Sequence, residues 1–169
     1  MKTVAMKEAP AKSGPKPAPK FKNRRRSARE LALQGIYQWR LTASEAGFIE
    51  AQLRSASFFA RVDAVFFSDL LQGVIKHADE LEQKIAPCLY RTFQELSPIE
   101  LSILLLSTYE LIYHPNIPYR PIINESIELA KTFGGTDGHK YINGVMDKLA
   151  AQLRGTEVAL HAKKTAKFH

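Results

Sequence analysis

The spacing of apolar side chains over residues 24–154 predicts helices throughout. Apolar residues recur three and four positions apart, and no stretch keeps a two-residue alternation bounded by turn signals. The first helix is expected from Arg24 or Ser27 to Leu41. On its helical wheel one arc is apolar and should face the core: Ala28, Leu31, Ala32, Gly35, Ile36 and Trp39.

The clearest helix boundary is the capping box Ser97-Pro98-Ile99-Glu100, in which the Ser hydroxyl and the Glu carboxylate each bond an otherwise unpaired backbone N–H. The helix that it opens is apolar almost all round, so we expect it to be central, and it stops at His114-Pro115. Two helices are expected before it, one following Ser44 through Phe59 and one from just after Asp63 to Pro87.

Two further helices follow, over Pro121–Phe133 and from about Gly138 to Leu153. Six or so helices joined by short links predict an all-α bundle of six to seven helices, formed by one domain over residues 24–154. Residues 1–23, rich in Lys, Pro and Ala, are expected to be a disordered basic extension. Residues 155–169 are expected to be a basic flexible tail.

The net charge of +7 is unevenly distributed along the chain. Residues 1–26 carry a net charge of +8 and residues 154–169 a net charge of +3, whereas residues 27–153 carry −4. Basic ends on an acidic body favour an arm that binds a polyanion over a uniformly basic protein.

Several kinds of chemistry find no support in the sequence. The single cysteine, Cys88, excludes an intramolecular disulfide and lacks an evident His or Asn partner for nucleophilic catalysis. The five histidines show no pair at metal-ligand spacing with a third ligand nearby. Residues 1–20 hold no apolar run typical of a secretory signal, and the apolar run Leu101–Ile112 is too short to span a bilayer. We therefore expect a soluble cytoplasmic protein without cofactor, metal, membrane contact or enzymatic activity.

Arginines at positions 24–26 and 29 open the first predicted helix, where the helix dipole makes cations locally unfavourable. A bound phosphate backbone would favour them, because it pairs with guanidinium groups and with N-terminal amides. The wheel places an aromatic ring among cations on the outer face, an arrangement typical of single-stranded RNA binding: Arg26, Arg29, Leu33, Tyr37 and Arg40. The alternative is a solvated basic helix whose Tyr37 is covered by a neighbouring helix.

Three other positions have open interpretations. Tyr141 lies at the edge of the last helix's apolar stripe and is either a packing residue or a second stacking surface. Glu110 is expected to be buried, and we favour its accepting hydrogen bonds over its acting as a tuned acid. The loop of residues 134–140 lacks the spacing of a phosphate loop and is interpreted as a helix link in which Thr136 or Asp137 caps the last helix.

Five segments together resemble the bacterial NusB transcription antitermination factors. The segment RRRSARELALQGIYQWRLT is similar to the opening of that family, and the others follow in the family's order: FFSDLLQGV, ELSPIELSILLLSTYELIY, PYRPIINESIELAKTFG and GHKYINGVMDKLA. The resemblance covers residues 24–154. It implies two perpendicular three-helix bundles and no catalytic activity.

The resemblance also implies partners. They are boxA RNA of ribosomal RNA operon leaders and NusE, which is also a small-subunit ribosomal protein; with NusA and NusG they act on transcribing RNA polymerase and suppress termination. The residues that match the RNA-contacting pattern, with Arg24 added from the arginine run, are Arg24, Arg25, Arg26, Arg29, Tyr37 and Tyr141. Glu100 and Asp137 match positions at or near the partner surface. The alternative function is a protein–protein scaffold with a solvated basic arm.

Two leucines depart from the family pattern. Leu101 and Leu105 stand where relatives often carry basic or polar residues. If exposed, they form an apolar patch that favours self-association or changes the affinity for NusE. The sequence leaves monomer or homodimer open.

Overall fold

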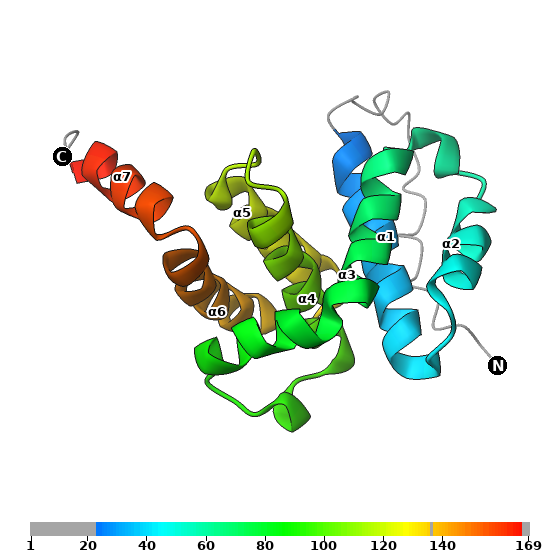
Figure 1. The fold of residues 1–169 in the computed structure, drawn as a ribbon, viewed down its shortest axis with the longest axis horizontal. Helices are drawn as coiled ribbons and strands as arrows, with labels where there is room; N and C mark the ends of the chain where they lie inside the picture. The colour runs from blue at the N-terminus through cyan, green and yellow to red at the C-terminus, as the bar shows by residue number, and fades with distance from the viewer. Residues whose placement is uncertain (1–22, 136, 167–169) are drawn as a thin grey trace.

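The computed structural model describes residues 23–135 and 137–166, and this part of the chain is helical without strands. The all-α class is therefore confirmed. Figure 1 shows the α-helices in order: α1 (Asn23–Thr42), α2 (Ala46–Arg54), α3 (Ala64–Ile85), α4 (Pro98–Tyr113), α5 (Tyr119–Phe133), α6 (Gly138–Leu153) and α7 (Gly155–Ala166). The predicted N-terminal extension lies outside the described residues, apart from Asn23.

Short 3-10 turns join some of these helices, over Phe59–Arg61 (η1), Ala86–Cys88 (η2) and Phe93–Glu95 (η3). The second helix ends at Arg54, earlier than the predicted extent through Phe59. At its end the hydroxyl of Ser55 donates to the carbonyl of Gln52 at 2.6 Å. Such a local bond offers the backbone an alternative to the next helical turn.

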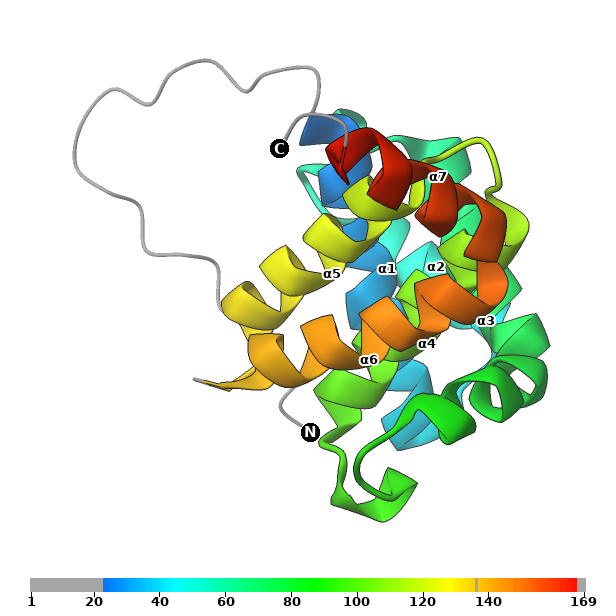
Figure 2. The ribbon, with the colours of Figure 1, turned by 90° about the vertical axis from the view of Figure 1, so that its left-hand side faces the viewer.

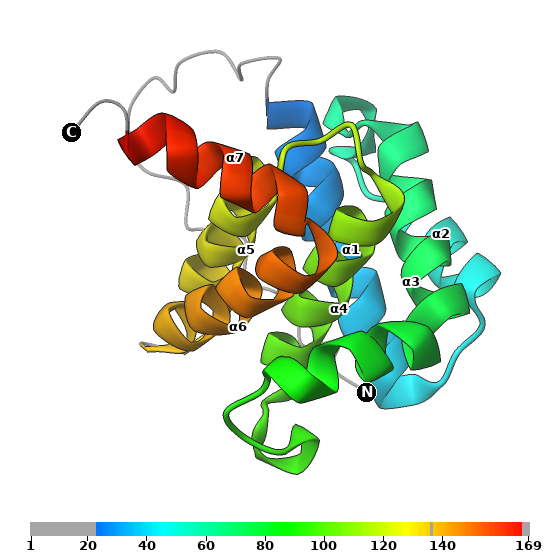
Figure 3. The same cartoon turned by 60° about the vertical axis from the view of Figure 1, so that its left-hand side comes forward.

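Helix α4 is central, as its apolar sequence predicts. Every residue from Leu101 to Leu111 is buried, and α4 packs against α1, α3, α5 and α6. Figures 2 and 3 show α5 and α6 side by side against α4, with α1 and α3 on another side. The apolar surface patch that Leu101 and Leu105 would form if they were exposed is absent, because Leu101 is 6% and Leu105 0% exposed.

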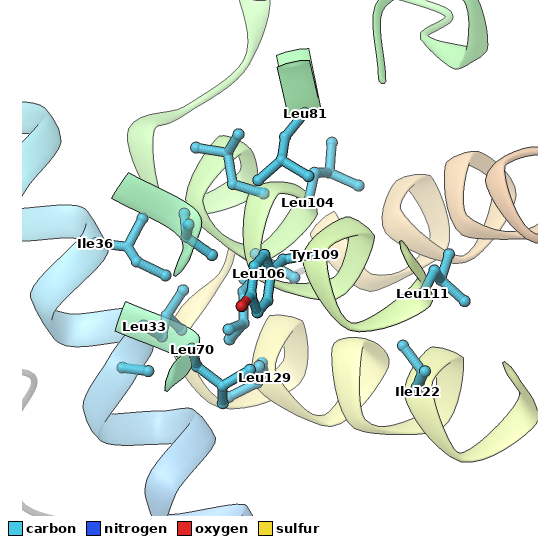
Figure 4. Close-up of a cluster of buried hydrophobic side chains, with 14 of the residues drawn as sticks. Leu33, Ile36, Leu70, Leu81, Leu104, Leu106, Tyr109, Leu111, Ile122 and Leu129 are labelled. Atoms are coloured by element: carbon cyan, nitrogen blue, oxygen red, sulfur yellow. The ribbon is translucent and has the colours of Figure 1, made fainter. Parts of the chain in front are cut away.

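The hydrophobic core contains buried side chains from α1 to α6, whereas no residue of α7 is buried. Figure 4 shows the clustered side chains, among which are Leu33, Ile36, Leu70, Leu104, Leu106 and Leu129. Leu33 is 0% exposed, so its predicted place on the outer face of the first helix is wrong. The reason is that α1 packs on α2, α3 and α4 together, so its buried face is wider than one arc of the wheel.

A seventh helix continues the chain beyond α6, where the sequence predicts no regular element. It begins directly after Arg154, whose side chain is 8% exposed. The guanidinium donates to the carbonyls of Leu111, His114 and Ile117 at 2.8, 3.0 and 2.9 Å. Arg154 therefore supplies donors to the carbonyls of Leu111 and Ile117 and a second donor to that of His114, which also accepts the N–H of Ile117.

The first turn of α7 is fixed by Glu157. Its carboxylate accepts the Arg154 guanidinium at 2.7 Å and the backbone N–H of Tyr119 at 2.7 Å. Burial raises the pKa of Glu157, but the Tyr119 N–H and the Arg154 charge outweigh it, so the pKa lies below its usual value. The charged form of Glu157 is the one that holds α7 in place.

We expect this contact to weaken in acid. A carboxyl pKa lowered by folding contributes stability that is fully present above its unfolded value of about 4 and is lost as the pH falls through the folded pKa. The melting temperature of Glu157→Gln should therefore lie below that of the parent at neutral pH, and the difference should shrink as the pH drops below about 4. Glu128→Gln, an exposed carboxylate of α5, is the control. A difference that stays constant with pH would contradict the assignment.

Candidate nucleic-acid interface

The arginine cluster at the start of α1 is matched by carboxylates from other helices. The Nε atom of Arg25 lies 3.8 Å from Asp63, at the start of α3, and that of Arg26 lies 3.2 Å from Glu125 of α5. Arg24 donates instead to the carbonyls of Ala60 and Val62, at 3.4 and 3.2 Å. These contacts explain how α1 tolerates cations at its N-terminus, where its own first turn holds no acidic residue.

Arg24, Arg25 and Arg26 nevertheless stay on the surface. The side chain of Arg25 is 54% exposed and that of Arg26 is 49% exposed. The hydrogen bond and the charge of Glu125 raise the pKa of Arg26, which keeps its charge at any working pH. Exposed ion pairs contribute only about 0–1 kcal/mol, so a phosphate can take the place of either carboxylate at little cost.

Arg29 is different, and the prediction that it stands on the outer face is wrong. The residue is 6% exposed. Its Nε atom donates to both carboxylate oxygens of Glu110 at 3.0 Å, and its Nη2 atom donates at 2.8 Å. The favoured interpretation of Glu110, a buried carboxylate that accepts hydrogen bonds, is confirmed. Fold stability alone therefore accounts for Arg29, contrary to the argument from the helix dipole.

A small hollow lies beside the cluster, between α1 and α5. Its volume is about 80 Å³, and its walls are Arg26, Arg29, Glu30, Glu125, Glu128, Leu129 and Thr132. Burial raises the pKa of Glu30. Sites for small organic molecules measure about 300–1,000 Å³, so this hollow is too small to be one.

Tyr37 follows Glu30 by seven residues, close to two helical turns, and lies on the same side of α1. Its ring is half-buried. Within the described chain, Trp39 belongs to the partly buried side chains that pack against the core, whereas Tyr37 does not. A role for Tyr37 in stacking on a base stays a prediction.

Tyr141 of α6 is placed as a packing residue. It packs against the core, and its hydroxyl accepts the backbone N–H groups of Tyr90 and Arg91, both at 3.3 Å. The guanidinium of Arg91 lies 4.2 Å from the centre of its ring. One face of Tyr141 is therefore already covered, and the residue holds the loop between α3 and α4.

Glu100 and Asp137 begin neighbouring helices. The capping box is confirmed, because Ser97 Oγ accepts the N–H of Glu100 at 3.1 Å and Glu100 Oε1 accepts the N–H of Ser97 at 3.0 Å. A Cβ atom on Gly138 would lie 3.8 Å from Glu100 Oε2, so the starts of α4 and α6 adjoin. This end of the molecule lies one α4 length, about 24 Å, from the arginine cluster.

The expected cap of α6 is found only in part. Asp137 occupies the N-cap position and is exposed, but its side chain makes no capping hydrogen bond within the described residues. The other candidate, Thr136, lies outside the described residues. An exposed carboxylate at a helix start remains favourable through the helix dipole alone.

The sequence indicates that Tyr141 lies near Lys148 but not that it contacts Tyr90 and Arg91. The only signal is the Tyr-Arg pair in the predicted link between the third and fourth helices. Nothing in the helical periodicity brings that link against α6.

A model of the NusB family matches residues 26–151 of this chain. The chain belongs to the NusB family. The transcription antitermination protein NusB of Nitrosomonas eutropha is 61% identical over 138 residues, which cover 82% of this chain and 83% of that protein. NusB of Paraburkholderia phymatum is 52% identical over 144 residues, 85% of this chain and 99% of that protein.

Solved NusB structures share the fold. T. maritima NusB has a TM-score of 0.63 at 24% identity and covers 74% of this chain and 89% of its own. NusB in a crystal structure with NusE and double-stranded RNA has a TM-score of 0.64 at 19% identity, over 73% of this chain and 93% of its own. Among residues 23–135 and 137–166, no helix combines the length and apolar character needed to cross a bilayer.

Proposed function

We propose that this chain is a non-catalytic transcription antitermination factor of the cytoplasm that binds boxA RNA of ribosomal RNA operon leaders together with NusE. The observation that carries the proposal is the exposed set Arg24, Arg25 and Arg26 at the N-terminus of α1, in a chain 61% identical to a NusB protein. The NusB structure determined with NusE and RNA gives the partner classes. The wider assembly contains RNA polymerase, NusA and NusG.

The chemistry of the RNA contact follows from the cluster. Each guanidinium has five N–H donors in a planar fork that fits a phosphate. The guanidinium groups of Arg25 and Arg26 are about half exposed, and the N-terminal amides of α1 add donors in the same direction. A phosphate backbone crossing the start of α1 exchanges places with Asp63 and Glu125.

The partner contact is assigned to the opposite end of α4. Glu100 and Asp137 place two carboxylates at the adjoining starts of α4 and α6, and a ribosomal protein is a basic partner that they would attract. An adaptor with RNA at one surface and protein at another raises the apparent affinity of each ligand for the other, since the second contact becomes intramolecular. The mechanism is stoichiometric joining, without a chemical step.

The RNA contact is tested with the double variant Arg25→Gln, Arg26→Gln. We expect weaker binding of boxA-type RNA, and a dependence of log affinity on log salt that flattens by about 0.7 for each phosphate that the variant no longer neutralises. Arg54→Gln is the matched control, because Arg54 is a 41% exposed arginine paired with Glu50 on α2. Arg29 is left intact because it is part of the core. RNA affinity equal to that of the parent would favour the scaffold alternative.

The partner contact is tested by calorimetric titration of NusE. Asp137→Asn should weaken NusE binding and lower the melting temperature only slightly, because its side chain makes no capping bond and only its interaction with the helix dipole is lost. Glu100→Gln should also weaken binding while keeping the box, since Gln serves at that position. If both variants bind NusE like the parent, the partner surface lies elsewhere.

A further inference from the structure

The side chain of Phe66, in the first turn of α3, lies against two guanidinium groups of α1. The Cζ atom of Arg25 is 4.7 Å from the centre of the Phe66 ring, and that of Arg29 is 5.1 Å from the same centre. The electrons of an aromatic ring attract a cation at this distance, and the planar shape of a guanidinium allows it to stack on the ring. Phe66 therefore connects the exposed Arg25 with the buried Arg29.

The Phe66 ring is fixed by its surroundings. It is 4% exposed and belongs to the hydrophobic core. The ring of His114 meets it edge to face, with the centres 5.3 Å apart and an angle of 85° between the planes. Arg29 is itself held by its hydrogen bonds to Glu110. The core thus provides a rigid support on which the guanidinium of Arg25 rests.

The start of α3 holds Arg25 by a second contact, through Asp63. The Oδ1 atom of Asp63 accepts the backbone N–H of Phe66 at 3.1 Å, and its Oδ2 atom lies 3.8 Å from Nε of Arg25. A phosphate that takes the place of Asp63 beside Arg25 removes the ion pair but not the contact with the ring. Arg25 therefore keeps its support on Phe66 when its carboxylate is exchanged for a phosphate.

Arg26 differs from Arg25 in this respect. Within the described chain its guanidinium pairs with Glu125 and stacks on no aromatic ring. The two arginine side chains are nevertheless similarly exposed, 54% for Arg25 and 49% for Arg26. Arg26 is therefore a matched comparison for the effect of the ring.

We propose that Phe66 is a positioning residue for the RNA contact, because its ring holds the guanidinium of Arg25 in one orientation before the RNA arrives. This rests on the proposed RNA-binding function of the arginine cluster. An arginine without such a support must be ordered when the RNA binds, and ordering one flexible side chain lowers the affinity by about 2- to 10-fold. Arg29 supports the same contact from the core, through Phe66.

The test is a titration of the full chain with a boxA-type single-stranded RNA, followed by fluorescence anisotropy at a temperature where the variants are folded. Phe66→Leu should weaken binding by about 2- to 10-fold and leave the salt dependence unchanged, since Arg25 still neutralises its phosphate. In the Arg25→Gln background, Phe66→Leu should have no further effect, because the side chain that it positions is gone. Phe67→Leu is the control for lost core packing, since Phe67 is 0% exposed and packs edge to face on Phe59.

A second pair of variants leaves the core unchanged. Arg25→Lys and Arg26→Lys both keep the positive charge, but lysine lacks the planar group that stacks on a ring. Arg25→Lys should therefore weaken RNA binding more than Arg26→Lys does.

The outcomes separate the two proposals. If the parent and Phe66→Leu bind RNA equally well, Phe66 does not position Arg25 and the proposed function stands. An equal loss from Phe66→Leu with and without Arg25→Gln would mean that the ring acts through the fold alone, which overturns the proposal. If Phe66→Leu does not fold, equal losses in Arg25→Lys and Arg26→Lys overturn it. If the parent does not bind RNA, the proposed function fails and the positioning role with it.

Discussion

Replacing Arg29 by alanine is expected to destabilise the fold by about 3–5 kcal/mol, the range for breaking a buried ion pair. The Glu110 carboxylate is 1% exposed and lies in the central helix α4. The substitution removes the Nε and Nη2 donors of Arg29 that it accepts. A charge in that position has no access to water, so it must either remain unpaired or take up a proton.

Urea unfolding of Arg29→Ala beside Arg26→Ala measures this effect. Arg26 is the matched control, because it also pairs with a glutamate but its side chain is 49% exposed, and its loss should cost about 1 kcal/mol or less. The double variant Arg29→Met, Glu110→Leu should regain much of the stability, since apolar residues of similar volume replace buried pairs well. Equal stability of the two single variants would mean that Glu110 is satisfied without Arg29.

The second large effect is expected at Arg154. Arg154→Met keeps the aliphatic part of the side chain but leaves the carbonyls of Leu111 and Ile117 without a donor, whereas the carbonyl of His114 still accepts the N–H of Ile117. Each unsatisfied buried group costs about 1–3 kcal/mol, so the two carbonyls together should cost about 2–5 kcal/mol.

Loss of Arg154 should also release α7, because Glu157 loses its cation. Amide hydrogen exchange should therefore rise over Gly155–Ala166 before it rises in α4. Arg120→Met, an exposed arginine of α5, is the control for the charge change. Unchanged protection of α7 in Arg154→Met would show that Val158 and the Tyr119 contact hold the helix by themselves.

The sequence predicts most of the helices because their signals are local. The capping box at Ser97, the prolines and the apolar stripes all act within a few residues of the boundary that they set. The central position of α4 follows in the same way, since a helix that is apolar all round must be covered on all sides.

The failures concern contacts between distant residues. Arg29 and Glu110 are 81 positions apart, and a helical wheel drawn for one helix contains no information about a carboxylate on another. In the sequence, Arg154 stands next to the basic tail and is counted with its charges. Its partners lie 37–43 positions earlier, at the end of α4 and in the loop after it, so no local pattern reveals them. The contacts of Tyr90 and Arg91 with Tyr141 are not predicted for a related reason: the path of a loop over α6 has no periodic signal.

The carboxylates beside Arg25 and Arg26 also determine how many linked phosphates a ligand needs in order to bind there. A single small anion gains one guanidinium and displaces one carboxylate, so the exchange yields almost no net free energy. A polymer that presents several phosphates at fixed spacing displaces Asp63 and Glu125 together, and it meets the helix amides in the same event. As the proposed RNA contact, the arginine cluster would therefore discriminate by the number of linked charges, and we expect free phosphate or nucleotides at cellular concentrations to compete poorly for it.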